Sequence, residues 1–181
     1  YFEEGSGKLL YWWHSKDGKN FYQHGDGTIR QGLQKINGIM YYVKDDYIYS
    51  GEIEINGEIY SFKARNGEME TGSVLLSNGK RILVKEDGSH PKGWVTYNND
   101  KYYVDKDGYI LEGFNTVDGK RYYFEEGSGK LLYWWHSKDG KNFYQHGDGT
   151  IRQGLQKING IMYYVKDDYI YKGALELNGV T

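Results

Sequence analysis

The sequence predicts an all-β fold, a β-hairpin solenoid in which each repeat of about 20 residues contributes one hairpin. Three observations predict it: a two-residue turn that recurs at this spacing, an aromatic strand that follows each turn, and a long segment that occurs twice without a single change. No stretch shows the 3.6-residue periodicity of a helix, and short strands at regular spacing are typical of all-β repeats.

The recurring turn is mostly Asn-Gly or Asp-Gly. A type I′ hairpin turn needs a positive φ at both central residues, and these residue types tolerate it. The predicted turns are Asp17-Gly18, Asn37-Gly38, Asn56-Gly57, Asn78-Gly79, Asn98-Asn99, Asp118-Gly119, Asp139-Gly140, Asn159-Gly160 and Asn178-Gly179.

An aromatic-rich strand begins two or three residues after each complete turn, as in "MYYV", "KYYV" and "RYYF". Alternate residues of a strand point to the same face, so every second residue can enter one core. The residues between them meet a neighbouring hairpin or solvent. The predicted axial core consists of the pairs Tyr41 and Val43, Tyr60 and Phe62, Ile82 and Val84, Tyr102 and Val104, and Tyr122 and Phe124.

A second, looser turn follows each aromatic strand, for example at Asn66-Gly67 and Asp148-Gly149, and a glycine such as Gly32 or Gly93 then closes the unit. Each unit is therefore strand, tight turn, strand and looser turn. One isolated hairpin of this size is only marginally stable in water. Stacked neighbours supply the missing burial, which is how a solenoid is stabilised.

The duplication sets a longer period of 122 residues, because residues 1–49 recur at 123–171 and the first difference is Ser50 against Lys172. We therefore expect residues 1–181 to form a single repeat array, a fragment of a longer protein, with this super-repeat inside it. A catalytic domain has one active site and little use for an unchanged second copy, so the duplication favours a binding or structural role.

The composition excludes several functions. Aromatic residues make up 17% of the chain, with 20 Tyr and 5 Trp, which argues against disorder. A net charge of −2 without a basic patch argues against nucleic acid, and the lack of a long apolar run argues against membrane insertion. With no Cys, no metal-ligand spacing of His and no nucleophile or phosphate-binding motif, we expect no metal, no cofactor and no enzymatic activity.

The units resemble the bacterial cell-wall-binding repeat superfamily, which includes choline-binding modules, the glucan-binding repeats of glucansucrases and the C-terminal repeats of large clostridial toxins. The resemblance rests on "INGIMYYV", "VDGKRYYFEEGSG" and "GWVTYNNDKYYVDKDGYILEG", and it covers essentially the whole chain. It implies a solenoid with roughly three hairpins per turn, in which the two copies of residues 1–49 face the same direction.

The choline-type unit resembles "GWxxxxGxWYYL", with two Trp residues. Here the first Trp is clear only in Gly93-Trp94, and Trp13 and Trp135 are equivalents without the preceding Gly. The second Trp is replaced in every unit, for example by Arg121. A quaternary ammonium group needs several aromatic faces around it, so the sequence disfavours choline, and the glucan-binding branch fits better.

The duplicated stretch from Tyr11 to Gln31 has the residue types of a saccharide site, which needs an exposed aromatic platform and polar groups around it. Trp12 and Trp13 are adjacent, so we expect one to pack and the other to be exposed. Gln23 occupies a core-like position, which predicts a local opening. The candidate ligand-binding residues are Trp12, Trp13, His14, Gln23, Arg30, Gln31, Trp94, Trp134, Trp135, His136, Gln145, Arg152 and Gln153.

The function predicted first is a non-catalytic carbohydrate-binding module that anchors a secreted or surface protein of a Gram-positive bacterium to a polysaccharide or oligosaccharide: α-glucan, cell-wall polysaccharide or host oligosaccharide. Two weak sites on one chain bind a polymer with avidity. A structural spacer or protein-interaction rod is the alternative, and a choline-binding module is a third. Exposed sheet edges at the ends of the array would allow end-to-end self-association.

Overall fold

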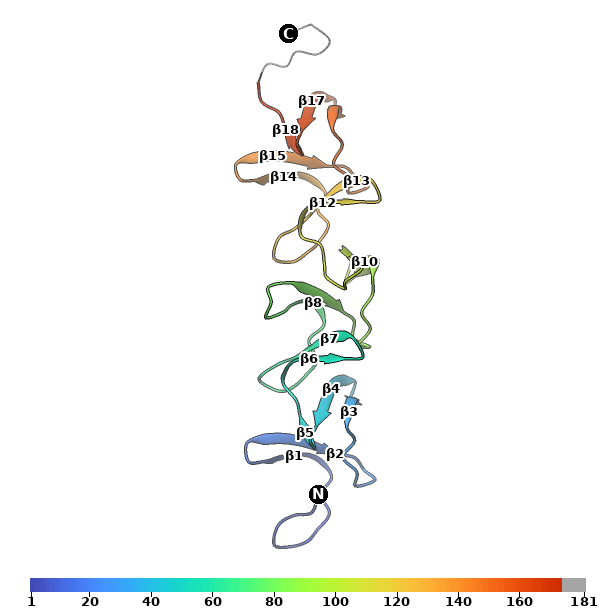
Figure 1. Cartoon of the computed structure of the whole chain (residues 1–181), viewed down its shortest axis with the longest axis vertical. Helices are drawn as coiled ribbons and strands as arrows, with labels where there is room; N and C mark the ends of the chain where they lie inside the picture. Colours follow the sequence, from blue (N-terminus) through green and yellow to red (C-terminus); the bar gives the residue numbers. More distant parts are fainter. Residues whose placement is uncertain (174–181) are drawn as a thin grey trace. The chain divides into compact units, whose positions relative to one another are not determined.

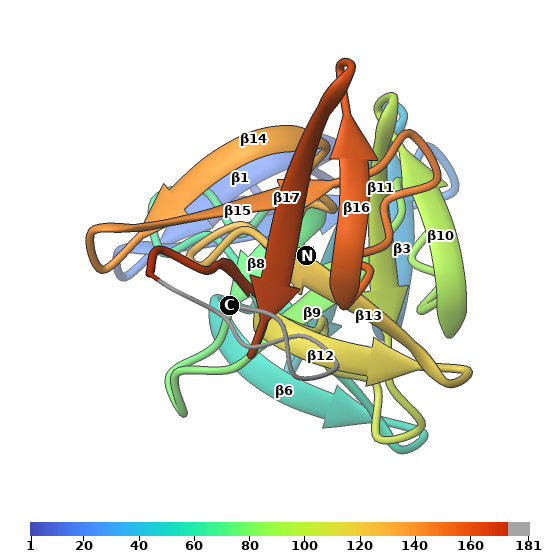
Figure 2. The ribbon, with the colours of Figure 1, turned by 90° about the horizontal axis from the view of Figure 1, so that it is seen from above.

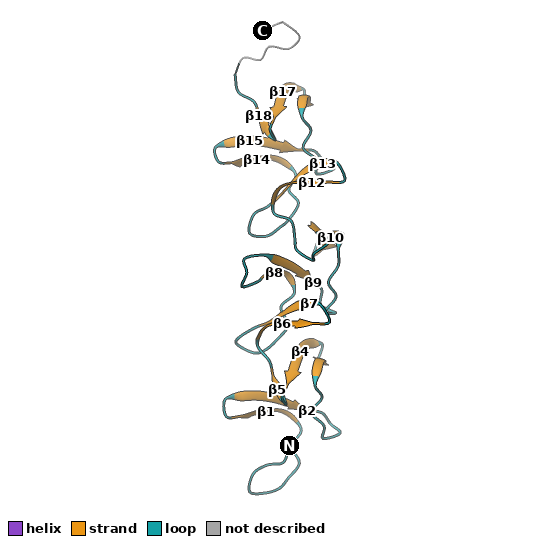
Figure 3. Ribbon diagram, in the orientation of Figure 1, coloured by secondary structure: helices purple, strands orange, loops and turns teal. Residues whose placement is uncertain are grey.

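The computed structural model describes residues 1–173, and within this range it contains 18 β-strands and no helix (Figures 1 and 3). The predicted all-β fold is therefore confirmed. The first nine strands are β1 (Trp12–Lys16), β2 (Lys19–Gln23), β3 (Gly32–Ile36), β4 (Ile39–Lys44), β5 (Tyr47–Ile48), β6 (Gly51–Ile55), β7 (Glu58–Phe62), β8 (Gly72–Leu75) and β9 (Arg81–Val84). The other nine are β10 (Gly93–Tyr97), β11 (Asp100–Val104), β12 (Gly113–Val117), β13 (Lys120–Phe124), β14 (Trp134–Lys138), β15 (Lys141–Gln145), β16 (Gly154–Ile158), β17 (Ile161–Lys166) and β18 (Tyr169–Ile170).

Every sheet is local in sequence. Six sheets are single antiparallel hairpins, and the other two, β3-β4-β5 and β16-β17-β18, add a third short strand to a hairpin. The chain divides into two compact units. Unit 1 contains Tyr1–Gly93 and Val104–Ile110, and unit 2 contains Trp94–Tyr103 and the chain from Leu111 onward. Each unit holds one copy of the duplicated segment.

The tight turns have the predicted backbone. In the first hairpin Lys16 faces Lys19, so Asp17 and Gly18 alone make the turn, with φ values of 51° and 74°. The pattern holds at most other predicted turns. These are Asn37-Gly38, Asn56-Gly57, Asn98-Asn99, Asp118-Gly119, Asp139-Gly140 and Asn159-Gly160.

Asn78-Gly79 differs, because only Gly79 has a positive φ and the amide of Leu76 bonds the carbonyl of Lys80 at 2.8 Å. The longer connection from Leu76 to Lys80 removes the need for a two-residue turn, so the type I′ prediction is wrong there. Asn178-Gly179 lies outside the described residues.

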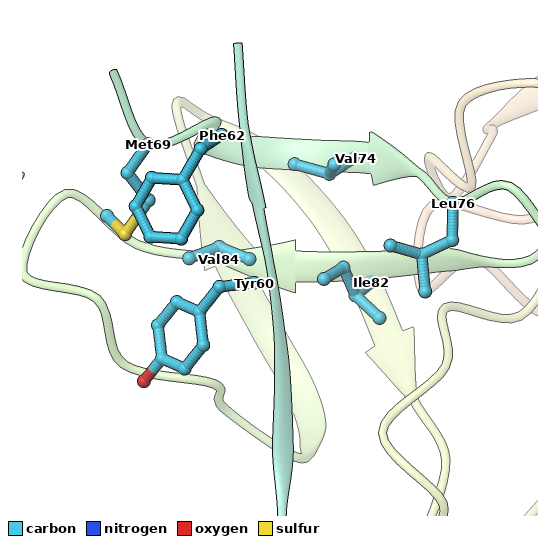
Figure 4. Packing of buried hydrophobic residues seen from close by; sticks show 7 residues of the cluster. All are labelled: Tyr60, Phe62, Met69, Val74, Leu76, Ile82 and Val84. Carbon is cyan, nitrogen blue, oxygen red and sulfur yellow. The ribbon is translucent and has the colours of Figure 1, made fainter. Parts of the chain in front are cut away.

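One core cluster of unit 1 joins side chains of the β6–β7 and β8–β9 hairpins with Met69, which lies between them in the chain (Figure 4). The ring of Phe62 lies close to Met69, which follows the looser turn, while Ile82 and Val84 come from the next hairpin. Burying side chains of this size contributes about 1.5–3 kcal/mol each before the entropy of ordering is subtracted. The buried members of this cluster are Tyr60, Phe62, Met69, Val74, Leu76, Ile82 and Val84.

Unit 2 is built in the same way. Two clusters centre on Phe124, which is fully buried, and on Phe143, which is almost so. All ten side chains of the five predicted core pairs are at most 9% exposed, so the predicted axial core is confirmed. The intervening residues vary: Tyr42 and Tyr103 are half-buried, whereas Leu83 and Tyr123 are buried.

Backbone hydrogen bonds join neighbouring hairpins. The residue after a looser turn donates its amide to a carbonyl of the preceding hairpin, as from Met69 to Met40 in unit 1 (2.8 Å) and from Ile151 to Arg121 in unit 2 (2.7 Å). Because main-chain atoms make this link, the 20-residue repeats can differ in their side chains and still stack. Figure 2 shows that the hairpins β12–β13, β14–β15 and β16–β17 of unit 2 point in different directions.

Candidate functional site

The most exposed Trp side chains lie at the start of β1 and β14. Trp12 is 59% exposed and Trp134 is 57% exposed, and both have positive φ values, 72° and 73°. At the same place in the other hairpins the chain carries glycine with a similar φ. These glycines are Gly32, Gly51, Gly72, Gly93, Gly113 and Gly154.

A bulky side chain at positive φ is an outlier that costs about 1–3 kcal/mol of backbone strain. The strain is present at both copies, and the half-exposed indoles gain little packing in return. Residues held in this way are concentrated at functional sites. Trp12 and Trp134 are therefore the strongest candidates for a platform that meets a ligand.

The indole of Trp12 leans toward the turn that follows β2. A Cβ atom added to Gly25 would lie 3.4 Å from Cη2 of Trp12, and at Gly147 the corresponding distance to Cη2 of Trp134 is 3.2 Å. Tyr22 supports the indole from its own hairpin, with ring centroids 6.2 Å apart. Glycine at position 25 leaves room for the ring, which links the "HGDG" turn to the platform.

Polar groups follow the platform along this turn. Asp26 Oδ1 accepts hydrogen bonds from the hydroxyl of Thr28 (2.6 Å) and from its amide (3.0 Å), and Nη2 of Arg30 donates to Oδ2 at 2.8 Å. These bonds hold the pKa of Asp26 well below its usual range. Hence the carboxylate is charged at neutral pH and offers, with Arg30, acceptors and donors for sugar hydroxyls.

The second copy repeats this turn in a more buried setting. Partial burial raises the pKa of Asp148, but hydrogen bonds from Thr150 and Arg152 outweigh it and hold the pKa at about 2. Asp148 is therefore also ionised at neutral pH. The polar rim next to Trp134 has the same donors and acceptors as that next to Trp12.

The second Trp of each pair packs more closely. The ring of Trp13 makes edge contacts with Tyr22 of its own hairpin (5.2 Å) and with Tyr41 of the next (5.1 Å), and 39% of its side chain stays exposed. Trp135 makes the equivalent contacts. Trp94, in unit 2, does the same with Tyr103 and Tyr122 and is half-buried. As expected for adjacent residues of a strand, the side chain of Trp13 is packed and that of Trp12 is exposed.

The two histidines among the predicted site residues support the hairpin. His14 Nε2 donates to the carbonyl of Tyr11 at 2.6 Å, and its ring lies 5.4 Å from that of Phe21. His136 bonds the carbonyl of Tyr133 in the same way at 2.7 Å. Both side chains are half-buried, so they fix the strand that carries the platform.

Gln23 and Gln145 are fully buried. Their Nε2 atoms donate to the carbonyls of Gly27 and Gly149, both at 2.7 Å. The predicted local opening at Gln23 is therefore wrong, because the amide spans the turn from inside instead of opening it. Neither side chain has surface to offer a ligand.

Arg30, Gln31, Arg152 and Gln153 are exposed. Gln31 Nε2 donates to Asp46 Oδ1 at 2.6 Å, and Gln153 does the same to Asp168 at 2.9 Å. The structure thus brings Trp12 close to the turn that follows β2 and ends at Arg30. Gln31 is drawn toward the neighbouring hairpin that carries Asp46.

Sequence reasoning missed Asp26 and Asp148, because an Asp beside a turn glycine is usually only a turn residue. The Asp-Gly-Thr-x-Arg pattern was the signal, since Asp can cap the amide two residues on and pair with Arg four residues on. Sequence reasoning also missed that Trp12 occupies a position where the other repeats have glycine, although aligning the repeats shows this.

Within residues 1–173 no group of three or more His, Asp or Glu side chains could hold a metal ion. In the same range no helix could cross a membrane.

Proteins of known family contain repeats that are similar in sequence to these. A family model described as "Putative cell wall binding repeat" matches residues 92–110 and 112–131. Glucosyltransferase-S of Streptococcus mutans serotype c is 32% identical over 137 residues, which cover 72% of this chain and 9% of that protein. Glucosyltransferase-S of Streptococcus downei is 30% identical over 112 residues, covering 58% of this chain and 7% of that protein. The chain thus spans less than a tenth of these relatives.

Solved structures share the fold. CbpJ from Streptococcus pneumoniae superimposes with a TM-score of 0.70 at 19% identity, over 94% of this chain and 61% of that one. Choline binding protein F from the same species gives 0.65 at 22% identity, over 90% and 58%. The resemblance predicted from the sequence is confirmed, and the chain is built from repeats of the bacterial cell-wall-binding and glucan-binding superfamily.

Proposed function

We propose that this chain is a non-catalytic carbohydrate-binding module whose ligand stacks on Trp12 in one copy of the duplicated segment and on Trp134 in the other. One observation carries the proposal: both indoles are more than half exposed and stand at positive φ where the other hairpins have glycine. An aromatic face stacks on the C–H face of a sugar ring, and Asp26 and Arg30 on the adjoining turn bond its hydroxyls.

The ligand we favour is an α-glucan. The relatives at 30–32% identity are named glucosyltransferases, enzymes whose name refers to the transfer of glucosyl groups. The matched region is under a tenth of each relative, so in such a protein the catalytic residues lie elsewhere and this module holds the enzyme on the polymer. The parent of this chain is then a secreted or surface protein of a Gram-positive bacterium.

We also propose that the hairpins wind as a solenoid with roughly three hairpins per turn, and that residues 1–181 are one array within a longer protein. The backbone hydrogen bonds from Met69 to Met40 and from Ile151 to Arg121 support this winding, because each links one 20-residue repeat to the hairpin before it. Two platforms on one array give avidity for a polymer from individually weak contacts.

Choline is the less favoured ligand. A quaternary ammonium group needs several aromatic faces around one space, but the ring of Trp13 is already in edge contact with those of Tyr22 at 5.2 Å and Tyr41 at 5.1 Å. At Trp94 the ammonium group of Lys101 already lies 5.5 Å from the ring centroid. It would repel a second cation there.

The test replaces both platforms by the residue that the other hairpins use. Trp12→Gly combined with Trp134→Gly should remove at least about tenfold of the affinity for dextran, measured by affinity electrophoresis, because stacking on an aromatic ring contributes about 0.5–1.5 kcal/mol or more per site. Phe2→Ala is the control, since Phe2 is 61% exposed and lies outside the platform.

Unchanged dextran retention of the double variant, with wild-type binding present, would show that the platforms are not the site. Absence of binding to dextran and to every glycan of an array by the wild-type chain would favour the structural spacer. Elution of the wild-type chain from a diethylaminoethyl resin by free choline would favour the choline-binding module.

A further inference from the structure

Unit 1 contains a small polar cleft that shares no residue with the Trp platforms. It has a volume of about 180 Å³ and lies between three segments of the chain: the turn between β1 and β2, strand β5 with its link to β6, and the looser turn after β7. No aromatic side chain lines it. The polar side chains of the lining are Lys19, Asn20, Ser50, Arg65 and Asn66.

The looser turn after β7 is seated directly on Ile48 of β5. The amide of Gly67 donates to the carbonyl of Lys63 at 2.8 Å, and a Cβ atom at Gly67 would overlap Cγ2 of Ile48. The φ of Gly67, 71°, also favours glycine. This close approach fixes the backbone of the turn against β5 before any ligand arrives, and such preorganisation reduces the entropy lost on binding.

Both charged side chains of the lining are cations. Lys19 and Arg65 are exposed, and neither side chain makes a hydrogen bond or an ion pair with any residue in the range 1–173. The ammonium group of Lys19 lies 5.4 Å from the ring centroid of Tyr47, and this cation–π contact holds it beside the cleft. The lining itself contains no carboxylate.

Two carboxylates near the lining are already bonded to other groups. Glu68, which follows Gly67, pairs with Lys63 at 2.9 Å. Glu52 is bound through both of its oxygens by the amide and the hydroxyl of Ser77, in the turn between β8 and β9. Neither carboxylate therefore neutralises the cations of the cleft.

The remaining charges near the cleft leave it positive. Asp17 precedes Gly18 in the β1–β2 turn and can offset one of the two cations, Lys19 and Arg65. Lys44 and Asp45, at the β4–β5 turn, add one charge of each sign. One positive charge therefore remains for a ligand.

The neutral side chains of the lining can also donate hydrogen bonds. Oδ1 of Asn66 accepts the amide of Glu68 at 3.2 Å, which leaves Nδ2 for a ligand. Asn20 adds a second amide group, and Ser50 adds a hydroxyl. A saccharide site needs an aromatic face and strong acceptors as well as donors. This cleft has neither, so its chemistry suits an anion.

We propose that this cleft binds a phosphate group, and that its natural source is a phosphodiester polymer. The three oxygens of a phosphate group point in different directions, and the donors here come from three segments of the chain. The two oxygens of a carboxylate lie in one plane and cannot reach all three. The volume is below the about 300–1,000 Å³ of pockets for larger organic ligands, which suits a group of this size. The chain therefore has a second kind of ligand besides a neutral glucan.

The test titrates the full chain with inorganic phosphate and, separately, with acetate as the carboxylate probe, and follows the amide NMR signals. Phosphate should shift the signals of Asn20, Ser50 and Arg65, and acetate should bind at least about fivefold more weakly, because it fills fewer of the donors. A glycerol-phosphate oligomer should shift the same signals. If inorganic phosphate bound and the oligomer did not, the free ion would be the ligand and the polymer would be excluded.

Variants assign the binding to this cleft. Lys19→Gln and Arg65→Gln should each weaken phosphate binding about fivefold, which corresponds to about 1 kcal/mol for an exposed charge pair. Both side chains are exposed, so the variants keep the fold. Lys35→Gln removes an exposed cation of β3 that does not line the cleft, and it should leave phosphate binding unchanged. None of the three variants should change retention on dextran, so this proposal and the platform proposal fail separately.

Three results would overturn the inference. The first is the absence of shifts at Asn20, Ser50 and Arg65 when phosphate is added. The second is equal affinity for phosphate and acetate, which would show a surface that attracts any anion. The third is an equal loss of phosphate binding from Lys35→Gln and Arg65→Gln, which would assign the effect to the overall charge of the chain.

Discussion

Arg121 holds Asp168 through two hydrogen bonds of 2.8 and 2.7 Å to one carboxylate oxygen. The side chain of Asp168 is only 12% exposed and that of Arg121 is 33% exposed. Asp46, the same residue of copy 1, is exposed and bonds Gln31 alone. The same Asp is therefore mostly buried and paired with an Arg in unit 2, whereas it is exposed and has no Arg partner in unit 1.

Removing Arg121 should destabilise unit 2. Arg121→Ala leaves the mostly buried Asp168 with Gln153 as its remaining partner, and the free energy of unfolding should fall by about 2–3 kcal/mol, less than for a fully buried pair because some solvent reaches it. Urea denaturation followed by Trp fluorescence measures this loss. Arg30→Ala, which breaks the exposed pair with Asp26, should cost under about 0.5 kcal/mol. Equal losses would contradict the burial argument.

Phe124 and Phe2 are a second matched pair, since they are the same residue of the two copies. Phe124 is fully buried and Phe2 is 61% exposed. Phe124→Ala should lower the free energy of unfolding by about 3–5 kcal/mol because it leaves a cavity in the core of unit 2. Phe2→Ala should change it by less than about 0.5 kcal/mol. Thermal denaturation followed by circular dichroism compares them, and similar melting temperatures would show that Phe124 is not a core residue.

The strain at Trp12 predicts an order of stability between two substitutions. Trp12→Gly should be more stable than Trp12→Ala by about 1 kcal/mol, because alanine keeps a Cβ atom at φ 72° and glycine does not. The same order should hold at Trp134. Chemical denaturation of the four single variants measures it, and an alanine variant as stable as the glycine variant would remove the strain argument.

His90 makes the stability of unit 1 depend on pH. Burial lowers the pKa of His90 below its ordinary 6.5, Glu58 opposes this effect, and Lys92 adds to it. Its ring packs edge-on against Tyr60 at 4.6 Å, and Nδ1 lies 3.8 Å from Glu58 Oε2. The folded chain therefore resists taking up a proton at His90.

Above pH 6.5 the stabilising effect of neutral His90 is complete. As the pH falls below this value, the unfolded chain binds a proton that the folded chain does not, and stability decreases by up to about 1.4 kcal/mol per pH unit until the lower folded pKa is reached. His90→Gln should reduce this slope in urea titrations between pH 6.5 and 5. His146, whose pKa burial also lowers, contributes a separate part of the slope that the variant keeps. An unchanged slope in the variant would assign the effect elsewhere.

The sequence was sufficient for the hairpins and their core because local chemistry decides both. Asn-Gly and Asp-Gly select the tight turn, and strict alternation in strands such as "KYYV" places Tyr102 and Val104 on one face. Asn78-Gly79 failed because the number of residues between the paired strands, which the dipeptide does not report, was larger there.

The candidate site could be predicted only in part. The Trp pair was visible, but the backbone angle of Trp12 depends on the hairpin register, in which Trp12 faces Gln23. Gln23 was misread because the amide nitrogen of a buried Gln can donate to a turn carbonyl from inside, here Nε2 to that of Gly27. The ion pair of Arg121 with Asp168 depends on packing between two hairpins, and no pattern within one repeat contains that information.

The duplicated strands also bear on how the chain finds its native pairing. The strand Trp12–Lys16 is chemically identical to Trp134–Lys138, so Lys141–Gln145 is as good a partner for it as Lys19–Gln23. Side-chain complementarity cannot reject the wrong pairing, and only loop closure can. Closing a loop of about 120 residues instead of a two-residue turn costs on the order of 3–4 kcal/mol more. The tight Asp17-Gly18 turn is therefore the element that favours pairing within the first hairpin over pairing with the identical strand of the second copy.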